Sequence, residues 1–229
     1  MHTLILQQLS MSIMAVAFAV FGIVTPALSA GTPEELVSKA EATFNNFQGD
    51  PEMKWICNHI AEAKAVIIAP EVRKAGLVAG ASGGRAVMLA RDPDTGKFSG
   101  PAFYSIRSAS LGLQAGIEKA EVVMLVMNDR ALNSLLSSQL KLGGDVSISL
   151  GPIGEGAEKS ITTDVVAFGR SKGIYGGLNL NGTLVTVNHE WNKQYYGKTV
   201  TPTDILVRRS VTNPRAERLL DKVAQAAIK

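Results

Sequence analysis

The sequence has few of the residues that build disulfides and metal centres. Its 229 residues include one cysteine, Cys57, three histidines and only 6% aromatic residues. A single cysteine cannot form an internal disulfide, and a metal site needs clustered His, Cys or carboxylate ligands. We therefore expect no metal ion and no cofactor, and a fold held together by side-chain packing alone.

A large excess of charge of one sign is also missing. The chain has 23 Lys and Arg against 20 Asp and Glu, a formal net charge of +3 and a sequence pI of about 9.0. It contains no basic tract of the kind that follows a nucleic-acid backbone. We therefore predict that nucleic acid is not a partner.

The small surplus of positive charge is concentrated at the C-terminus. Residues 205–229 contain six cations and two carboxylates, a net charge of +4, whereas residues 1–204 sum to −1. Cations on a terminal helix can bind anionic phospholipid, each contributing about 1 kcal/mol near a charged surface. An ordinary solvated helix face is the alternative interpretation. The candidate lipid-binding residues are Arg208, Arg209, Arg215, Arg218 and Lys222.

Charge is absent from the N-terminal segment, where no charged side chain precedes Glu34. An apolar run over 11–24 is followed by small residues that end at Ala30, a layout typical of a secretory signal peptide. We expect residues 1–30 to be the signal peptide and 31–229 a single exported domain, periplasmic or envelope-associated. An uncleaved anchor is the alternative, since 4–24 nearly spans a bilayer. A lipid-modified cysteine is not expected, because Cys57 lies far from the cleavage site.

The periodicity of apolar residues predicts an α+β fold: mainly an antiparallel β-sheet, sandwich or barrel, with N-terminal helices and a C-terminal helix packed on it. Helical spacing covers 33–47, about 51–63, 129–140 and a last segment from Asn213-Pro214. The 22 glycines favour tight turns between strands, and Asn181-Gly182 is the clearest turn. Short strand-like runs cover 65–69, 76–81, 86–91, 102–110, 122–128, 145–150, 163–169, 173–180 and 183–188.

One short pattern suggests catalysis. Residues 80–84 (GASGG) fit the G-x-S-x-G serine pattern, and Asp145 or Asp164 and then His189 follow in the chain order of α/β-hydrolases. A nucleophile elbow joins a strand to a helix, whereas the segment after Ser82 has the pattern of a second hairpin strand. We therefore expect a glycine-rich turn here, with a serine hydrolase centred on Ser82 as the alternative.

A set of collinear motifs then indicates a family. The chain resembles the SYLF domain family (also DUF500) over about residues 36–220. The motifs are 76–87 (GLVAGASGGRAV), 100–104 (GPAFY), 112–116 (GLQAG), 121–128 (EVVMLVMN), 142–154 (LGGDVSISLGPIG), 170–178 (RSKGIYGGL), and Asn192 followed by Tyr195-Tyr196-Gly197. Within them we expect six structural glycines: Gly76, Gly80, Gly83, Gly84, Gly176 and Gly177. The chain departs from the family at Glu121, where an Asp is usual.

The resemblance implies a non-enzymatic, membrane-associated domain. Eukaryotic members bind phosphoinositides and some bind actin, and exported bacterial members are described as lipid-binding proteins. An exported chain meets neither phosphoinositides nor actin, so anionic phospholipid is the available substitute. The expected function is binding of lipid or a membrane surface in the bacterial envelope, with an envelope protein partner as a further alternative and no catalytic residues.

The first testable prediction concerns export. Mass spectrometry of the protein from an envelope fraction should find Gly31 as the first residue, because the small residues at 27–30 form the cleavage site. An intact N-terminus in the cytoplasm would contradict export, and an intact one in the inner membrane would identify an anchor.

Overall fold

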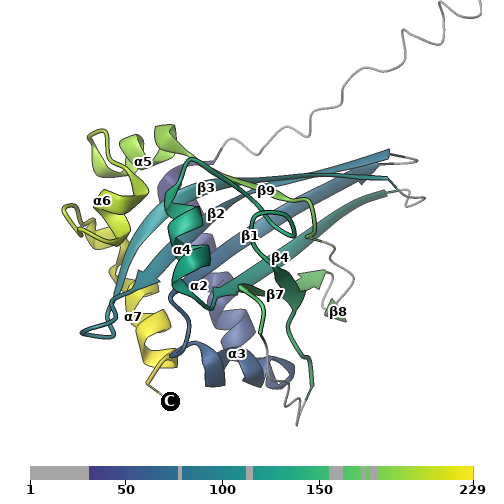
Figure 1. Cartoon of the computed structure of the whole chain (residues 1–229), viewed down its shortest axis with the longest axis horizontal. Helices are drawn as coiled ribbons and strands as arrows, with labels where there is room; N and C mark the ends of the chain where they lie inside the picture. Colours follow the sequence, from purple (N-terminus) through teal and green to yellow (C-terminus); the bar gives the residue numbers. More distant parts are fainter. Residues whose placement is uncertain are drawn as a thin grey trace, which may run out of the picture.

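Four long antiparallel strands form the centre of the fold (Figure 1). The structure is a computed structural model that describes residues 31–76, 79–111, 116–154, 162–171, 174–175 and 180–228. Its strands are β1 (Ala65–Gly76), β2 (Ala79–Arg91), β3 (Phe98–Leu111), β4 (Gly116–Val126), β5 (Gln139–Lys141), β6 (Ile148–Leu150), β7 (Val165–Ser171), β8 (Ile174–Tyr175) and β9 (Leu184–Val187). The predicted signal peptide lies outside the described residues.

The described strands make one curled sheet in the order β5-β9-β3-β2-β1-β4-β7-β6, with β8 beside β7. Every pair is antiparallel except β6 and β7. The helices are α2 (Pro33–Gln48), α3 (Lys54–His59), α4 (Asp129–Leu136), α5 (His189–Tyr196), α6 (Pro202–Leu206) and α7 (Glu217–Ala226). The predicted α+β class is confirmed, and of the three arrangements expected, a sheet, a sandwich or a barrel, the described strands form a single curled sheet. No helix in the described ranges is long and apolar enough to cross a bilayer.

Helix starts are predicted well because their caps are local in sequence. The Thr32 hydroxyl accepts a hydrogen bond from the backbone N–H of Glu35 at 3.2 Å, and Pro33 occupies the first position of α2. Asn213 caps the short turn before α7 in the same way. The expected helix over 129–140 is too long, since α4 ends at Leu136 and β5 follows.

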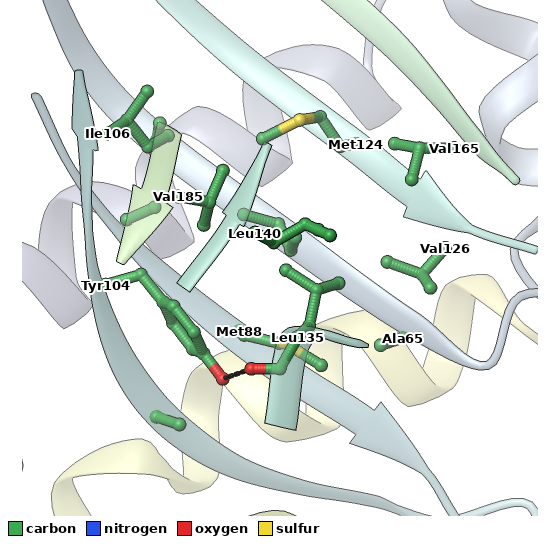
Figure 2. Packing of buried hydrophobic residues seen from close by; sticks show 14 of the residues in the cluster. Ala65, Met88, Tyr104, Ile106, Met124, Val126, Leu135, Leu140, Val165 and Val185 are labelled. Carbon is green, nitrogen blue, oxygen red and sulfur yellow. Dashed lines mark hydrogen bonds between the residues drawn. The ribbon is translucent and has the colours of Figure 1, made fainter. Parts of the chain in front are cut away.

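The sheet buries a different hydrophobic cluster on each face. On the inner face, side chains of β1 to β4 pack with α4, α6 and the short strands, and Figure 2 shows Met88, Met124 and Leu135 among them. The Tyr104 hydroxyl donates a hydrogen bond to the Leu135 carbonyl at 2.8 Å, which ties α4 to β3. On the outer face, Phe103 and its neighbours pack against α2, α3, α5 and α7.

Helix α5 also completes the edge of β3. The Asn192 amide oxygen accepts a hydrogen bond from the backbone N–H of Phe103 at 2.9 Å, and the Asn188 N–H donates to the Phe103 carbonyl at 2.9 Å. The Tyr196 hydroxyl donates to the Pro101 carbonyl at 3.0 Å. These contacts give Asn192 and Tyr196, both from the family motif, structural roles next to the sheet.

The expected glycine-rich turn over 80–84 is wrong, because these residues lie inside β2. Gly76 pairs with Gly80, Arg73 with Gly83 and Val72 with Gly84, so β1 and β2 each merge segments that the sequence pattern separates. The cause is a bulge in β1 between Ile68 and Glu71, which breaks the alternation of apolar residues there.

A close approach of two backbones explains Gly84. A Cβ atom at this position would lie 2.5 Å from the Glu71 carbonyl oxygen and 3.2 Å from the Val72 Cα. Gly83 has no such constraint, since the nearest heavy atom to a Cβ at that position would be the Ile106 carbonyl oxygen, at 3.6 Å. Gly176 and Gly177 lie outside the described residues.

The turn expected at Asn181-Gly182 is present. The Thr183 N–H donates to the Leu180 carbonyl at 3.1 Å, and Gly182 has a φ of 78°. However, the strand that follows, β9, pairs with β3 and β5. The prediction of a local hairpin between 173–180 and 183–188 therefore fails for the described strand β8, which pairs with β7.

These contacts predict a graded response to substitution in β2. Gly84→Ala should lower the free energy of unfolding by about 1–3 kcal/mol, since the new methyl group must push two backbones apart. Gly83→Ala, the matched control, should change it by less than about 1 kcal/mol, and Ser82→Ala by less than about 0.5 kcal/mol. Urea unfolding measures the free energy of unfolding of all three variants. Equal losses for Gly83→Ala and Gly84→Ala would contradict a close backbone contact that is specific to Gly84.

Candidate functional site

Two of the three candidate lipid-binding cations in and just before α7 are paired with carboxylates of α2. Arg215 lies 3.1 Å from Glu34, and Arg218 lies 3.1 Å from Glu41. Lys222 is exposed and has no ion pair in the part of the chain that the structure describes. The structure therefore keeps the expected outward orientation of these side chains but uses two of them to hold the first and last helices together.

The other two candidate cations are paired as well. Arg208 lies 2.9 Å from Asp204, four residues earlier. Arg209, at a φ of 55°, forms an ion pair with Asp92, a buried carboxylate in the turn between β2 and β3. The backbone N–H groups of Thr95 and Asp94, followed by the charge of Arg209, lower the pKa of Asp92 and outweigh its burial. The four carboxylates that pair with C-terminal arginines all lie outside residues 205–229, so they compensate the net charge of +4 in that segment.

The serine hydrolase alternative has no assembled site. Ser82 lies within β2, where it pairs with Lys74 on one side and Ser108 on the other, and no strand-to-helix elbow is present there. The alternation along β2 places Ser82 on the same face as Ala86, which is in the inner cluster. His189 begins α5, which packs on the outer face.

The candidate acid Asp164 has a structural role. Its carboxylate accepts hydrogen bonds from the Asn128 amide at 2.8 Å and from the Ser147 backbone N–H and hydroxyl at 2.7 and 2.8 Å. These donors lower its pKa to about 2. Asp145, the other candidate acid, accepts from the Lys141 N–H at 2.7 Å in a surface turn. Neither carboxylate is placed to orient His189.

Within the described ranges, no group of three or more His, Cys, Asp or Glu side chains could hold a metal ion. His59 stacks on Trp55 with ring centroids 3.8 Å apart, and its Nδ1 lies 2.9 Å from the Trp55 carbonyl oxygen. Cys57 lies on the same helix, α3, and is half-buried.

A row of cations that the sequence analysis missed crosses the outer face of the sheet. Arg73 on β1 pairs directly with Lys119 on β4 and with Gly83 on β2, and Gly83 pairs with Arg107 on β3. Residues that face each other in antiparallel strands point to the same side. We call Arg73, Arg107 and Lys119 the sheet-end row, since the register places them near the end of the sheet where Gly76 pairs with Gly80 and Gly116. Figure 1 shows the long strands extending past the helices at one end.

One carboxylate moderates the repulsion in this row. Glu71 forms an ion pair with Arg73 and another with Lys119, whose ammonium nitrogen lies 3.6 Å from its carboxylate. Partial burial raises the pKa of Glu71, but the hydrogen bond and charge of Arg73 and the charge of Lys119 outweigh it and leave the pKa below its usual value. Arg107 is exposed, with no hydrogen bond or ion pair among the described residues.

The cations one step nearer the core are engaged with the protein itself. Arg85, opposite Glu71, lies over the Trp191 ring at 4.2 Å from its centroid. Arg170 donates two hydrogen bonds to Glu121, which also accepts from the Thr43 hydroxyl at 3.0 Å. Among the described residues of this face, the sheet-end row is thus the group of cations nearest the ends of the long strands. Its members have fewer ion pairs and hydrogen bonds than Arg85 and Arg170.

The sequence contained a signal for this row. Residues 71–84 and 106–120 together hold four cations and two carboxylates, a net charge of +2. One expected strand ended at residue 69 and another began at residue 122. Arg73 and Lys119 therefore fell in expected loops just outside these strands. Only the extended strands bring these residues beside Arg107.

The contact between α2 and α7 predicts a charge-swap effect. Arg218→Glu should lower the free energy of unfolding by about 1 kcal/mol, because an attractive exposed pair becomes repulsive. Adding Glu41→Arg should restore most of that loss. Lys222→Glu is the matched control on the same helix and should have little effect. Thermal unfolding measures the stability of each variant. Equal losses in Arg218→Glu and in the double variant would contradict an ion pair between Arg218 and Glu41.

Comparison with known proteins supplies the family. Residues 107–226 match the family model Ysc84, described as Las17-binding protein actin regulator. SH3 domain-containing YSC84-like protein 1 is 32% identical in Bos taurus and 31% identical in Homo sapiens, in each case over 167 residues that cover 71% of this chain and 48% of that protein. Protein YSC84 of Saccharomyces cerevisiae is 31% identical over 156 residues, which cover 65% of this chain and 33% of that protein. The chain thus spans about half the length of the mammalian relatives and matches a third of the yeast protein.

The matched region includes the end of β3 from Arg107, all of β4, and the segment through the last helix, so it contains Arg107, Lys119 and the C-terminal arginines. The resemblance indicated by the motifs is confirmed: this chain belongs to the Ysc84 family, the family of the SYLF domain.

Proposed function

We propose that this protein is a non-enzymatic binding module that docks on an anionic phospholipid surface of the bacterial envelope. The observation that carries the proposal is the distribution of charge. The net +4 of the C-terminal segment is matched by four ion pairs with carboxylates elsewhere, whereas Arg73, Arg107 and Lys119 share a single carboxylate, Glu71, and keep a net charge of +2. Exposed cations near an anionic bilayer are each attracted by about 1 kcal/mol.

The names of the relatives support binding over catalysis. The family model is described as a Las17-binding actin regulator, and one yeast relative, 30% identical over 155 residues, is named LAS seventeen-binding protein 3. Those names describe binding to proteins. If this chain is exported, as its N-terminal segment predicts, the abundant anionic surface that it meets is phospholipid.

A protein partner in the envelope is the second candidate, favoured by those same names. It would use complementary acidic side chains in place of lipid phosphates. The two candidates differ in a simple property, because purified lipid alone is sufficient for the first and not for the second.

Vesicle flotation tests the proposal. The protein should float with vesicles that contain phosphatidylglycerol and stay behind with vesicles of phosphatidylcholine alone. Binding should weaken as salt is added, since charges on a surface are screened over about 10 Å at 0.1 M ionic strength. Equal binding to both vesicles would contradict electrostatic docking, and no binding to either would favour the protein partner.

The C-terminal cations give a second arm of the same experiment. Because four of them are paired, the unpaired Lys222 is the informative position. Lys222→Gln should reduce binding less than loss of an unpaired cation at the sheet end, if the sheet end is the main contact. A larger loss of vesicle binding for Lys222→Gln than for the sheet-end variant would indicate that α7 is the main docking surface.

A further inference from the structure

We propose that two copies of this chain associate through strand β6, with the β6 edge of one copy paired antiparallel to the β6 edge of the other. Such a pairing continues the curled sheet from one copy into the next, which is a known mode of strand addition. The inference goes beyond the proposed function, because it concerns a second copy of the chain and uses no cation of the sheet-end row.

Strand β6 lies at one end of the strand order, and among the described strands it pairs only with β7. The Ser147 carbonyl and the Gly151 N–H form hydrogen bonds with β7, at 3.0 and 2.8 Å. In a strand, the backbone groups of alternate residues point to the same neighbour. The N–H and C=O groups of Ile148 and Leu150 therefore point away from β7, toward the open side of the sheet.

These outward backbone groups are available to another strand. No residue in the described ranges forms a hydrogen bond with the outward groups of Ile148 and Leu150. Two residues earlier, the Val146 carbonyl accepts from the Gly143 N–H at 2.8 Å, so the outward side is occupied only up to that point. Leu150 is 49% exposed, and solvent therefore reaches this edge.

The opposite edge of the sheet, β5, is protected. The outward N–H of Lys141 donates to the Asp145 carboxylate at 2.7 Å, and the Lys141 carbonyl accepts from the Asp145 N–H at 2.9 Å. The exposed side chains of β5 are polar, Gln139 and Lys141. Charged side chains and blocked backbone groups are ordinary protections of an edge strand. Strand β6 has no charged residue and lacks both protections.

The β6 strand is also held in a fixed position. The Ser147 N–H and hydroxyl both donate to the Asp164 carboxylate, at 2.7 and 2.8 Å. The Ser149 hydroxyl lies 2.8 Å from the Thr163 hydroxyl. An edge that is already ordered loses little conformational entropy when another strand pairs with it.

The chemistry of this edge fits a second copy of β6. An uncharged edge with an exposed leucine suits a neutral, partly apolar strand, and of the two sheet edges described, only β6 has that character. With Ser149 of each copy near a two-fold axis, Leu150 of one copy stands opposite Ile148 of the other. The outward N–H and C=O groups of both residues then form hydrogen bonds, and the two apolar side chains lie on the same face.

Sedimentation velocity under reducing conditions measures the association. The wild-type chain should shift from monomer to dimer as its concentration rises, with weak affinity, because so short a strand pair buries less area than a standard interface. Leu150→Lys should raise the dissociation constant by about ten-fold or more, since it replaces an apolar contact with a charge at the edge.

Val207→Lys is the matched control. Val207 is 48% exposed, close to the value for Leu150. It follows α6, whose Leu206 carbonyl accepts from the Ser99 hydroxyl of β3, several strands away from β6. Val207→Lys should leave the dissociation constant unchanged within about two-fold.

Two further measurements locate the contact. Hydrogen exchange at the Ile148 and Leu150 amides should slow as the dimer forms, whereas exchange at the Lys141 amide, already bonded to Asp145, should not change. An equimolar mixture of Leu150→Lys and Leu150→Glu should dimerise more strongly than either variant alone. In the proposed register, the two copies of position 150 are diagonal neighbours within reach of long side chains.

The outcomes decide the proposal without any lipid. A wild-type chain that stays monomeric up to near-millimolar concentration would overturn it. So would a dimer that Leu150→Lys and Val207→Lys weaken equally, or one that leaves exchange at residues 148–150 unchanged. Thermal unfolding shows whether each variant is folded, and hydrogen exchange of the wild-type chain decides the question if Leu150→Lys does not fold.

Discussion

The hydrogen-bonded pairing of β1, β2, β3 and β4 is the constraint on which the rest of the structure depends. β2 stays paired with β3 from Arg91 to Ala79 and with β1 to their shared end at Gly76 and Gly80. Near the helices, the side chains on both faces are buried, in two separate hydrophobic clusters. Toward the other end, the same strands continue with small and charged residues. The proposed docking surface therefore consists of the ends of strands that the core has already aligned.

This alignment depends on a tight contact at the bulge in β1. Gly84 passes so close to the Glu71 carbonyl that a methyl group would not fit. The bulge also shifts the alternation of β1, so that Glu71 and Arg73 lie on the outer face beside Lys119 and opposite Gly83. One local irregularity thus determines both the packing at Gly84 and the composition of the sheet-end row.

Charge pairing then distinguishes two groups of cations that look alike in sequence. The C-terminal arginines are exposed, yet Arg215 and Arg218 face carboxylates of α2, which joins the first and last helices of the described chain. The sheet-end cations share one carboxylate, Glu71, and Arg107 has no described partner. Local charge in the sequence is similar in both groups, so only the identity of their neighbours separates structural cations from those available to a ligand.

The sequence by itself determined the family, the α+β class and the starts of the helices, because motifs, caps and apolar periodicity are local properties of the chain. Thr32, Asn213 and the Asn181-Gly182 turn all act within a few residues. It did not reveal that residues 80–84 continue a strand, since their glycines carry no apolar alternation and the bulge breaks the pattern of β1. Nor did it show which cations are paired, because Arg209 and Asp92 are far apart in the chain. The tertiary structure decided these points, since strand register and ion pairs join residues that only folding brings together.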